Sequence, residues 1–175
     1  MSSDLLQGFK SVWLWKRINQ KALDELENSL RRRVDEQDDS EARGELEQLR
    51  PCREELENFA ILSLWAVFEE TLNTWLAQRT HWAGVSAEDD KDVRRGLLRR
   101  IQHWSVAEKI DALQPVFGKK VTQDLHDLRK WRDWVAHRKT GPRPEAIDVD
   151  MAESLFISVM TCLEMRPDGM VEALA

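Results

Sequence analysis

The apolar residues of the first 35 positions recur at helical intervals, and this pattern constrains the fold more than any other feature of the chain. Charged side chains occupy the remaining positions. This periodicity predicts one long amphipathic helix from Ser3 to about Asp35. Its apolar positions are Leu5, Phe9, Val12, Trp13, Leu23, Leu26, Leu30 and Val34.

The same kind of periodicity continues along the rest of the chain. It predicts further helices at about 51–82, 91–101, 106–115, 120–138 and 150–165. Seven glycines, five prolines and no sustained alternation of polar and apolar residues leave little room for a sheet. A length of 175 residues with 42% hydrophobic content suits one domain, residues 1–175. We therefore expect an all-α domain: an antiparallel helical bundle with a four-helix core and one or two short helices.

Capping and breaking residues set the predicted helix boundaries. Asp38-Asp39-Ser40 ends the first helix or begins another, and residues 41–49 look too polar for a core element. Pro51 suits the first turn of the following helix, where its missing N–H would have no partner. Ser105-Val-Ala-Glu108 is a capping box, which predicts a helix start at 106. Thr140-Gly-Pro-Arg-Pro-Glu145 stops the preceding helix.

Two tryptophans near the N-terminus, Trp13 and Trp15, lie two residues apart. They therefore point in roughly opposite directions around a helix, and both cannot enter the same core. One indole is expected to meet something else. That contact is either a partner protomer or the surface of the protein itself, with the indole lying flat.

Charge is distributed unevenly along the chain, whose formal net charge is -6. Residues 1–90 hold 11 basic and 19 acidic side chains, residues 91–143 hold 14 and 6, and residues 144–175 hold 1 and 7. The basic third can attract a phosphate backbone although the whole chain is acidic. The alternative is a solvated helical surface that happens to be basic.

The cysteines, the histidines and the N-terminal sequence argue against several classes of protein. Cys52 and Cys162 suggest neither a disulfide framework nor a metal site, so a reducing cytoplasm is expected. The four histidines show no metal-ligand spacing, and we expect no metal or other cofactor. Met1 to Gly8 does not resemble a signal sequence, and no window is long and apolar enough to span a membrane.

The segment 121–139 combines a helical apolar stripe with a charge that interrupts it. Arg132 falls in the middle of the apolar face, so it is expected to be buried. Glu69 lies on the flank of the apolar side of the helix predicted at 51–82, and its opposite charge makes it the natural partner of Arg132. The apolar face itself consists of Val121, Leu125, Leu128 and Val135.

The other side of this helix carries His126, Asp133 and His137. Asp133 and His137 are four residues apart and so lie on adjacent turns, where the carboxylate can hold one imidazole nitrogen. The stop at residues 140–145 places His137 at a helix end.

Two segments together suggest a family. Arg132 and His137, with four residues between them, form a sequence that resembles the Arg-x4-6-His motif of the HEPN superfamily. Trp65-Ala-Val-Phe-Glu-Glu-Thr-Leu72 resembles the second-helix signature of HEPN domains of the RiboL-PSP kind. The resemblance covers these two segments and the all-helical layout.

The resemblance implies a function. HEPN domains are all-α bundles that commonly form homodimers, in which the Arg and His of both protomers line a cleft at the interface. The active members are endonucleases that cleave RNA without a metal, and many serve as toxins in toxin–antitoxin or antiphage defence systems. An antitoxin protein is therefore a possible partner.

The resemblance also assigns roles to individual residues. His137 would be the general acid or base, since its ordinary pKa suits either role at neutral pH. Arg132 would stabilise charge on the phosphorus, Asp133 would orient the motif, and Glu69 would support Arg132. Four basic side chains would hold the RNA backbone without reading its sequence. They are Arg129, Lys130, Arg138 and Lys139.

One position departs from a subgroup of HEPN toxins in which the motif extends to His-x-Tyr and a partner adenylylates the tyrosine. Lys139 stands at that position, and the chain contains no tyrosine. Two other classes of function stay open. One is a non-catalytic helical interaction module, and the other is a nucleotide-binding bundle that uses the same cationic cleft without cleavage.

Overall fold

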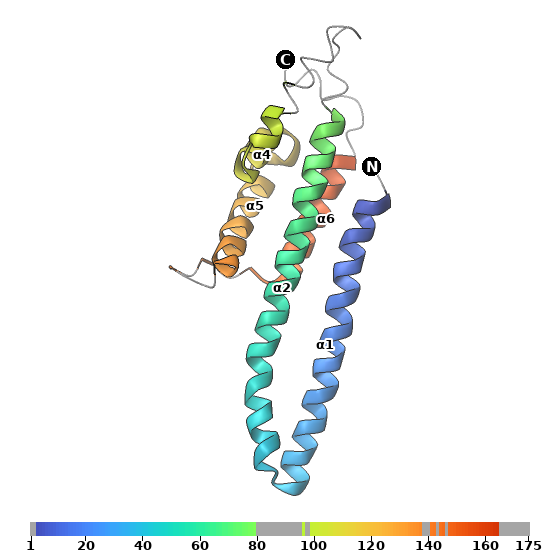
Figure 1. Cartoon of the computed structure of the whole chain (residues 1–175), viewed down its shortest axis with the longest axis vertical. Coiled ribbons are helices and arrows are strands. Elements are labelled where there is room, and N and C mark those ends of the chain that lie inside the picture. Colours follow the sequence, from blue (N-terminus) through green and yellow to red (C-terminus); the bar gives the residue numbers. More distant parts are fainter. Residues whose placement is uncertain are drawn as a thin grey trace.

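The computed structural model describes residues 3–79, 96, 99–137, 141–142, 144–145 and 147–164. Within these residues, α-helix is the only extended regular structure (Figure 1). The prediction of an all-α fold is confirmed. The labelled helices are α1 (Ser3–Gln37), α2 (Ser40–Arg79), α4 (Val106–Ala112), α5 (Gln114–Ala136) and α6 (Val149–Glu164).

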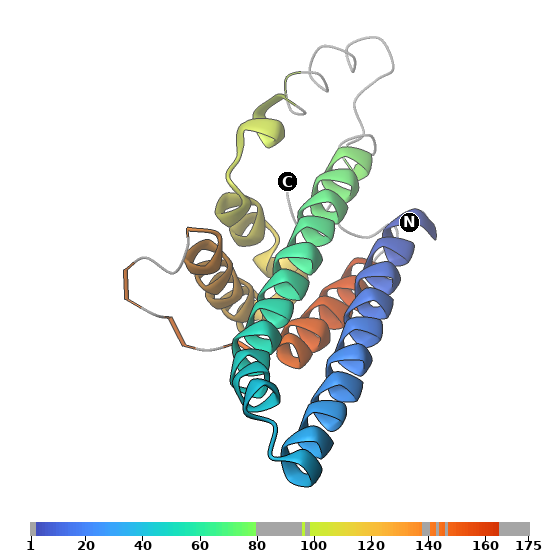
Figure 2. The ribbon, with the colours of Figure 1, turned by 60° about the horizontal axis from the view of Figure 1, so that its bottom comes forward.

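Four of these helices form an antiparallel bundle. α1 packs along α2, while α5 and α6 pack against each other and against α2. The chain runs down α1, up α2, down α5 and up α6 in the view of Figure 1, and Figure 2 shows the same arrangement from another side. The short helix α4 packs against α5. The expected architecture, a four-helix core with a short additional helix, is therefore present.

Aromatic rings join three helices in the centre of the bundle. The ring of Phe68 on α2 lies 5.2 Å from that of Trp65 and 5.3 Å from that of Phe156 on α6. Phe156 in turn lies 5.6 Å from Phe9 on α1. All four side chains are at least 98% buried. Burial of each is worth about 2–3 kcal/mol relative to exposure, so this cluster fixes how α1 and α6 sit on α2.

α1 and α2 extend beyond the other helices as a two-helix hairpin (Figures 1 and 2). This extension has a small core of its own, in which Leu30, Ala42 and Leu49 are buried. The expectation that residues 41–49 contribute no core was therefore wrong. A helix with a single partner needs only a narrow apolar seam, and Ala42, Leu46 and Leu49 provide one at the three- and four-residue spacing of a coiled coil.

The helix start expected at Pro51 was also wrong, because α2 begins at Ser40 and continues through Pro51. A proline inside a helix removes the hydrogen bond to the carbonyl four residues earlier, which here belongs to Glu47. Pro51 and Glu47 are both exposed, so water can reach that carbonyl. Packing of the hairpin on both sides of Pro51 keeps the helix continuous.

Asp39 forms the turn between α1 and α2. Its Oδ1 accepts hydrogen bonds from the backbone N–H groups of Glu41 and Ala42, both at 3.0 Å. Its Oδ2 accepts from Arg33 Nε at 2.9 Å and Nη2 at 2.7 Å. The Ala42 N–H, and next to it Arg33, hold the pKa of Asp39 below its ordinary value of 3.8. One carboxylate thus caps α2 and ties it to the end of α1.

Asp39→Ala is expected to lower the urea midpoint of unfolding at neutral pH. The folded pKa of Asp39 is depressed, so its contribution is complete above pH 3.8 and is lost as the pH falls through the folded value. The difference between variant and wild type should therefore shrink in acid. Urea titrations at neutral pH and at a pH below the folded pKa of Asp39 measure this difference, with Asp35→Ala as the control for an exposed carboxylate near the end of α1. A difference that persists at low pH would contradict this account.

Candidate functional site

Local sequence determines where α4 and α5 begin and end. The predicted capping box at Ser105 is confirmed: its hydroxyl accepts from the Glu108 N–H at 3.2 Å, and the Glu108 carboxylate accepts from the Ser105 N–H at 2.6 Å. α4 ends at Ala112, and α5 has a break at Gly118, where φ is 78°. That conformation favours glycine. The uninterrupted part of α5 follows this break and ends at Ala136, close to the predicted limits of 120–138.

The predicted apolar face of α5 enters the core as expected. Leu125 and Leu128 are fully buried, and Val121 and Val135 pack against the core at its edge. Trp131 is also buried, with its ring 5.1 Å from that of Trp134, although the stripe did not include it. The two indoles widen the buried face next to Arg132.

Arg132 forms the ion pair that the sequence predicted. Its Nη2 lies 3.0 Å from Glu69 Oε1 on α2, and its Nη1 donates to Asp133 Oδ1 at 2.8 Å. The guanidinium carbon also lies 5.8 Å from the centre of the Trp65 ring. The expectation of burial was wrong, because the side chain is 32% exposed. The long arginine side chain covers apolar surface with its stem and keeps its charged end at the rim between α2 and α5.

Glu69 connects Arg132 to the core. The same Oε1 atom that pairs with Arg132 also accepts a hydrogen bond from Trp65 Nε1. Trp65 is 1% exposed, and its indole N–H therefore depends on a protein acceptor. Glu69 thus satisfies a buried donor and a half-buried cation at once.

Asp133 faces arginines with both carboxylate oxygens. Oδ1 accepts from Arg132, and Oδ2 lies 3.6 Å from Arg129 Nη1. The main-chain N–H of His137 also donates to the Asp133 carbonyl, at 2.9 Å. The arrangement suits Asp133 to orient Arg132.

His137 lies at the C-terminal end of α5, as the sequence predicted. It is the C-cap residue, with φ -89° and ψ 28°, and it is exposed. Arg132 lies five residues earlier on the same helix. Five residues correspond to about 7.5 Å along the helix axis and about 140° around it, so the two side chains leave α5 in different directions.

The predicted RNA-binding side chains are only partly described. Arg129 is half-buried beside Asp133, and Lys130 is exposed with its Nζ 2.8 Å from Asp127 Oδ1. Arg138 and Lys139 lie outside the described residues. The same holds for Lys91, Arg94 and Arg95 of the helix predicted at 91–101. Arg99 and Arg100 of that segment are helical and exposed.

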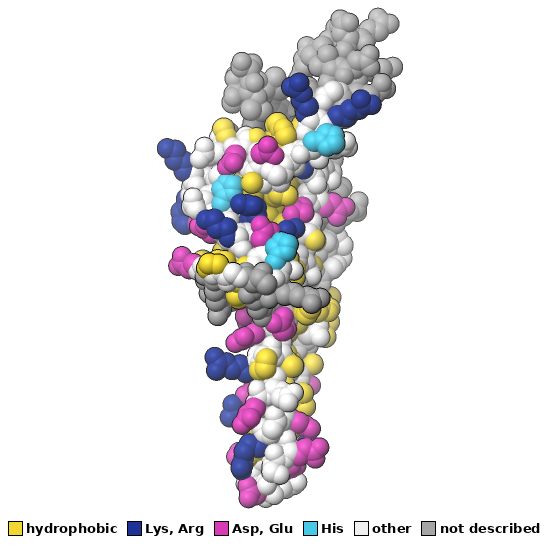
Figure 3. Space-filling model, turned by 60° about the vertical axis from the view of Figure 1, so that its left-hand side comes forward, with side chains coloured by type: hydrophobic (Ala, Val, Ile, Leu, Met, Phe, Trp, Pro, Cys, Tyr) yellow, Lys and Arg dark blue, Asp and Glu magenta, His cyan; other side chains and the backbone are white. Residues whose placement is uncertain are grey.

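His126 has a partner that sequence analysis missed. Its Nε2 lies 2.7 Å from Asp111 Oδ1, across the contact between α4 and α5. The sequence placed His126 on the same side of α5 as Asp133 and His137, but Asp111 belongs to another helix. Only the packing of α4 on α5 shows this pair. In Figure 3, which brings the α4 and α5 side forward, histidine, basic and acidic side chains are intermingled on this face.

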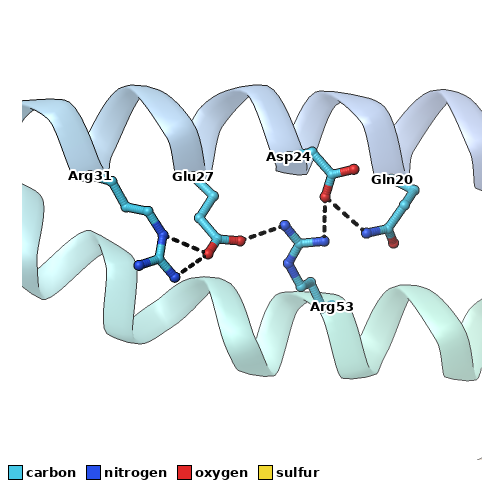
Figure 4. A network of polar contacts seen from close by, with 5 residues as sticks. All are labelled: Gln20, Asp24, Glu27, Arg31 and Arg53. Carbon is cyan, nitrogen blue, oxygen red and sulfur yellow. Dashed lines mark hydrogen bonds and ion pairs between the residues drawn. The ribbon is translucent and has the colours of Figure 1, made fainter.

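A second group of arginines lines a hollow of about 460 Å³ on the two-helix extension. Figure 4 shows part of it: Arg53 on α2 pairs with Asp24 and Glu27 of α1, each at 2.7 Å, and Arg31 pairs with Glu27 at 2.6 Å. The remaining arginines of the hollow also face carboxylates. They are Arg43, 2.9 Å from Asp38, and Arg50, 3.7 Å from Glu54. Arg53 thus joins α2 to α1, whereas Arg31 and Arg50 pair within their own helices.

Two kinds of feature are absent from the part of the chain that the structure describes. No helix there is long and apolar enough to cross a membrane. No group of three or more histidine, cysteine, aspartate or glutamate side chains is placed to hold a metal ion, again among the described residues. Of the predicted site residues, Glu69, Arg132 and Asp133 meet at the rim between α2 and α5, and His137 follows at the end of α5.

Comparison of the chain with protein-family models, with curated proteins and with solved structures finds no match.

Proposed function

We propose that the protein is a metal-independent endoribonuclease of the HEPN type. One observation carries the proposal: α5 holds Arg132, fixed at the rim by Glu69 and Asp133, five residues before the exposed His137 at its end. The Arg132 side chain is 32% exposed at the rim, so a bound phosphate can reach part of it. An RNA-cleaving site gains from such access.

The proposed reaction is an internal transfer at phosphorus. A base removes the proton of the ribose 2′-hydroxyl, O2′ attacks the adjacent phosphorus, and the bond to the 5′-oxygen breaks as that oxygen takes a proton. The products are a 2′,3′-cyclic phosphate and a 5′-hydroxyl. His137 serves as the general acid or base, because an imidazole exchanges protons readily at neutral pH. DNA lacks the 2′-hydroxyl and is spared.

Arg132 acts on the charge that accumulates during this reaction. A guanidinium has five N–H donors in a rigid plane, and Glu69 and Asp133 each engage one of its terminal nitrogens. The exposed part of the group is available to oxygen atoms on phosphorus. Because its partners fix the plane in advance, little reorganisation is needed when negative charge develops.

The substrate backbone is held by cationic side chains around this end of α5. Arg129 and Lys130 belong to this set. Arg138 and Lys139, which come directly after His137 in the sequence, belong to it as well. Contacts of this kind bind phosphate without reading bases. A second copy that brings its own Arg132 and His137 would complete the cleft, with the C-terminal part of α5 in the interface. The biological role we propose is that of a cytoplasmic toxin in a toxin–antitoxin or antiphage system, neutralised by a protein partner.

The test is cleavage of labelled single-stranded RNA by the purified full chain in excess EDTA. Cleavage is expected to continue, to leave 2′,3′-cyclic phosphate and 5′-hydroxyl ends, and to be absent on DNA of the same sequence. Loss of activity in EDTA, or cleavage of the DNA, would overturn the mechanism. A protein inactive on structured and unstructured RNA alike would favour the second candidate.

The second candidate is a non-catalytic helical interaction module. The network around Arg132 favours it in one respect: both terminal nitrogens of the guanidinium face carboxylates, as in an ion pair that fixes how α2 and α5 pack. In that case the network would stabilise the bundle and nothing more.

A further inference from the structure

Five large apolar side chains are exposed on the α1/α2 hairpin. The exposed fractions are 59% for Leu14, 43% for Trp15, 59% for Ile18, 46% for Leu26 and 57% for Phe59. Trp13 packs against the core, so Trp15 is the indole that the sequence expected to meet something else.

These side chains lie on one side of the hairpin. Ile18 is nine residues after the buried Phe9, and Phe59 is nine residues before the buried Phe68, which places each about half a turn from its core residue. Both therefore point away from the bundle core. α6 lies behind α1 and α2 in Figure 1, so their uncovered side faces the viewer.

Ile18 on α1 and Phe59 on α2 lie at the same height along the axis of the hairpin. Gly8 approaches Val67, and Glu27 bonds Arg53, so the antiparallel helices are matched at these two points. Ile18 lies about midway between Gly8 and Glu27, and Phe59 lies about midway between Arg53 and Val67. The five side chains thus form one patch across both helices, which we call the outer patch.

Charged residues border the outer patch. One heptad before Ile18 and one heptad after Phe59, the same faces carry Ser11 and Ala66, which are small and uncharged. One heptad after Ile18 is Glu25, whose carboxylate lies 3.8 Å from Lys21 Nζ, and the exposed Glu55 lies four residues before Phe59. Ala22 continues the row of Leu14, Ile18 and Leu26 at four-residue intervals. Rows of this spacing are the ridges that interdigitate in helix-on-helix packing, and a small residue such as Ala22 leaves a groove.

We propose that a second copy of this chain docks on the outer patch. Five roughly half-exposed side chains of about 200 Å² each offer on the order of 500 Å² per copy, against about 800 Å² per partner in a standard interface. The total of about 1,000 Å² over both copies is at the lower limit for a specific interface. In a two-fold contact the same patch lies on both sides, so its apolar centre meets the apolar centre of the other copy while Lys21 and Glu25 lie at its edge, as in homodimer interfaces with an apolar core and a polar rim.

This contact is independent of the proposed nuclease. The outer patch lies on α1 and α2, whereas Arg132 and His137 lie on α5, so the two contacts use different helices. The mass of the assembly in solution distinguishes a contact through the outer patch from a contact through the end of α5. A dimer made through the outer patch alone becomes a monomer when the patch is disrupted, and a tetramer that uses both surfaces becomes a dimer.

The experiment is sedimentation velocity of the full chain across the micromolar range, for wild type, Ile18→Glu, Phe59→Glu and Ile157→Glu. Ile157 on α6 is the matched control, because it is 50% exposed but lies outside the outer patch. The wild type is expected at two or four times 20.5 kDa. Ile18→Glu and Phe59→Glu should each halve the mass and raise the dissociation constant at least about tenfold, and Ile157→Glu should not.

Circular dichroism checks that each variant keeps its helix content, which exposed substitutions should not disturb. A monomeric wild type would overturn the proposal and leave the patch to a different protein. An unchanged mass for Ile18→Glu and Phe59→Glu, or an equal loss in Ile157→Glu, would overturn it as well.

Discussion

His137→Ala is expected to lower the rate of RNA cleavage by about 10²–10⁴-fold, the usual contribution of a general acid or base. His137 is exposed and is the C-cap residue of α5, so its side chain lies outside the described core. The variant should keep its thermal unfolding temperature. It should also keep most of its affinity for RNA, because the basic side chains of α5 are unchanged.

Cleavage rates at saturating enzyme, on one labelled RNA, measure this effect. His103→Ala is the matched control, since His103 is also exposed but lies before α4 and outside the proposed site. It should cleave as the wild type does. Activity of His137→Ala within a few-fold of wild type would remove His137 from the mechanism, and equal losses in both variants would point to a general effect of histidine removal.

Glu69→Ala is expected to lower the free energy of unfolding by about 1–3 kcal/mol. The change removes the acceptor of the buried Trp65 indole N–H and the α2 partner of Arg132 together. The first loss carries most of the effect, because Trp65 is 1% exposed and water cannot replace the acceptor. The ion pair adds less, since Glu69 and Arg132 are 28% and 32% exposed and solvent screens them.

Urea unfolding measures this difference, with Glu70→Ala as the control. Glu70 is the neighbouring residue of the same type, and it is exposed. Its removal should change the free energy of unfolding by less than about 0.5 kcal/mol. Glu69→Gln keeps an acceptor for Trp65 and loses only the charge, so it should fall between the two. Equal small losses for Glu69→Ala and Glu70→Ala would rule out a structural role for the Glu69 network.

Much of the fold follows from local patterns, because helix periodicity and capping act over a few residues. The apolar stripe of residues 3–35 predicted α1 nearly to its observed end, and the capping box at Ser105 predicted the start of α4. The stripe of α5 placed Leu125 and Leu128 in the core. It also marked Arg132 as an interrupting charge, which needed an acidic partner, and Glu69 was the acidic side chain on the flank of the facing stripe.

What the sequence alone determined, then, is which segments are helical, which faces are apolar and which charges require a partner. Tertiary structure decided what depends on neighbouring helices. α2 continues through Pro51 because α1 covers its narrow seam, although the seam looks polar in isolation. Arg132 stays half-exposed because it lies at the rim between α2 and α5, and a helical wheel does not show where a neighbour ends. His126 meets Asp111 only because α4 packs on α5. The outer patch has the same origin: Ile18 and Phe59 share one uncovered face because two antiparallel helices align them, and no periodicity within either helix specifies that alignment.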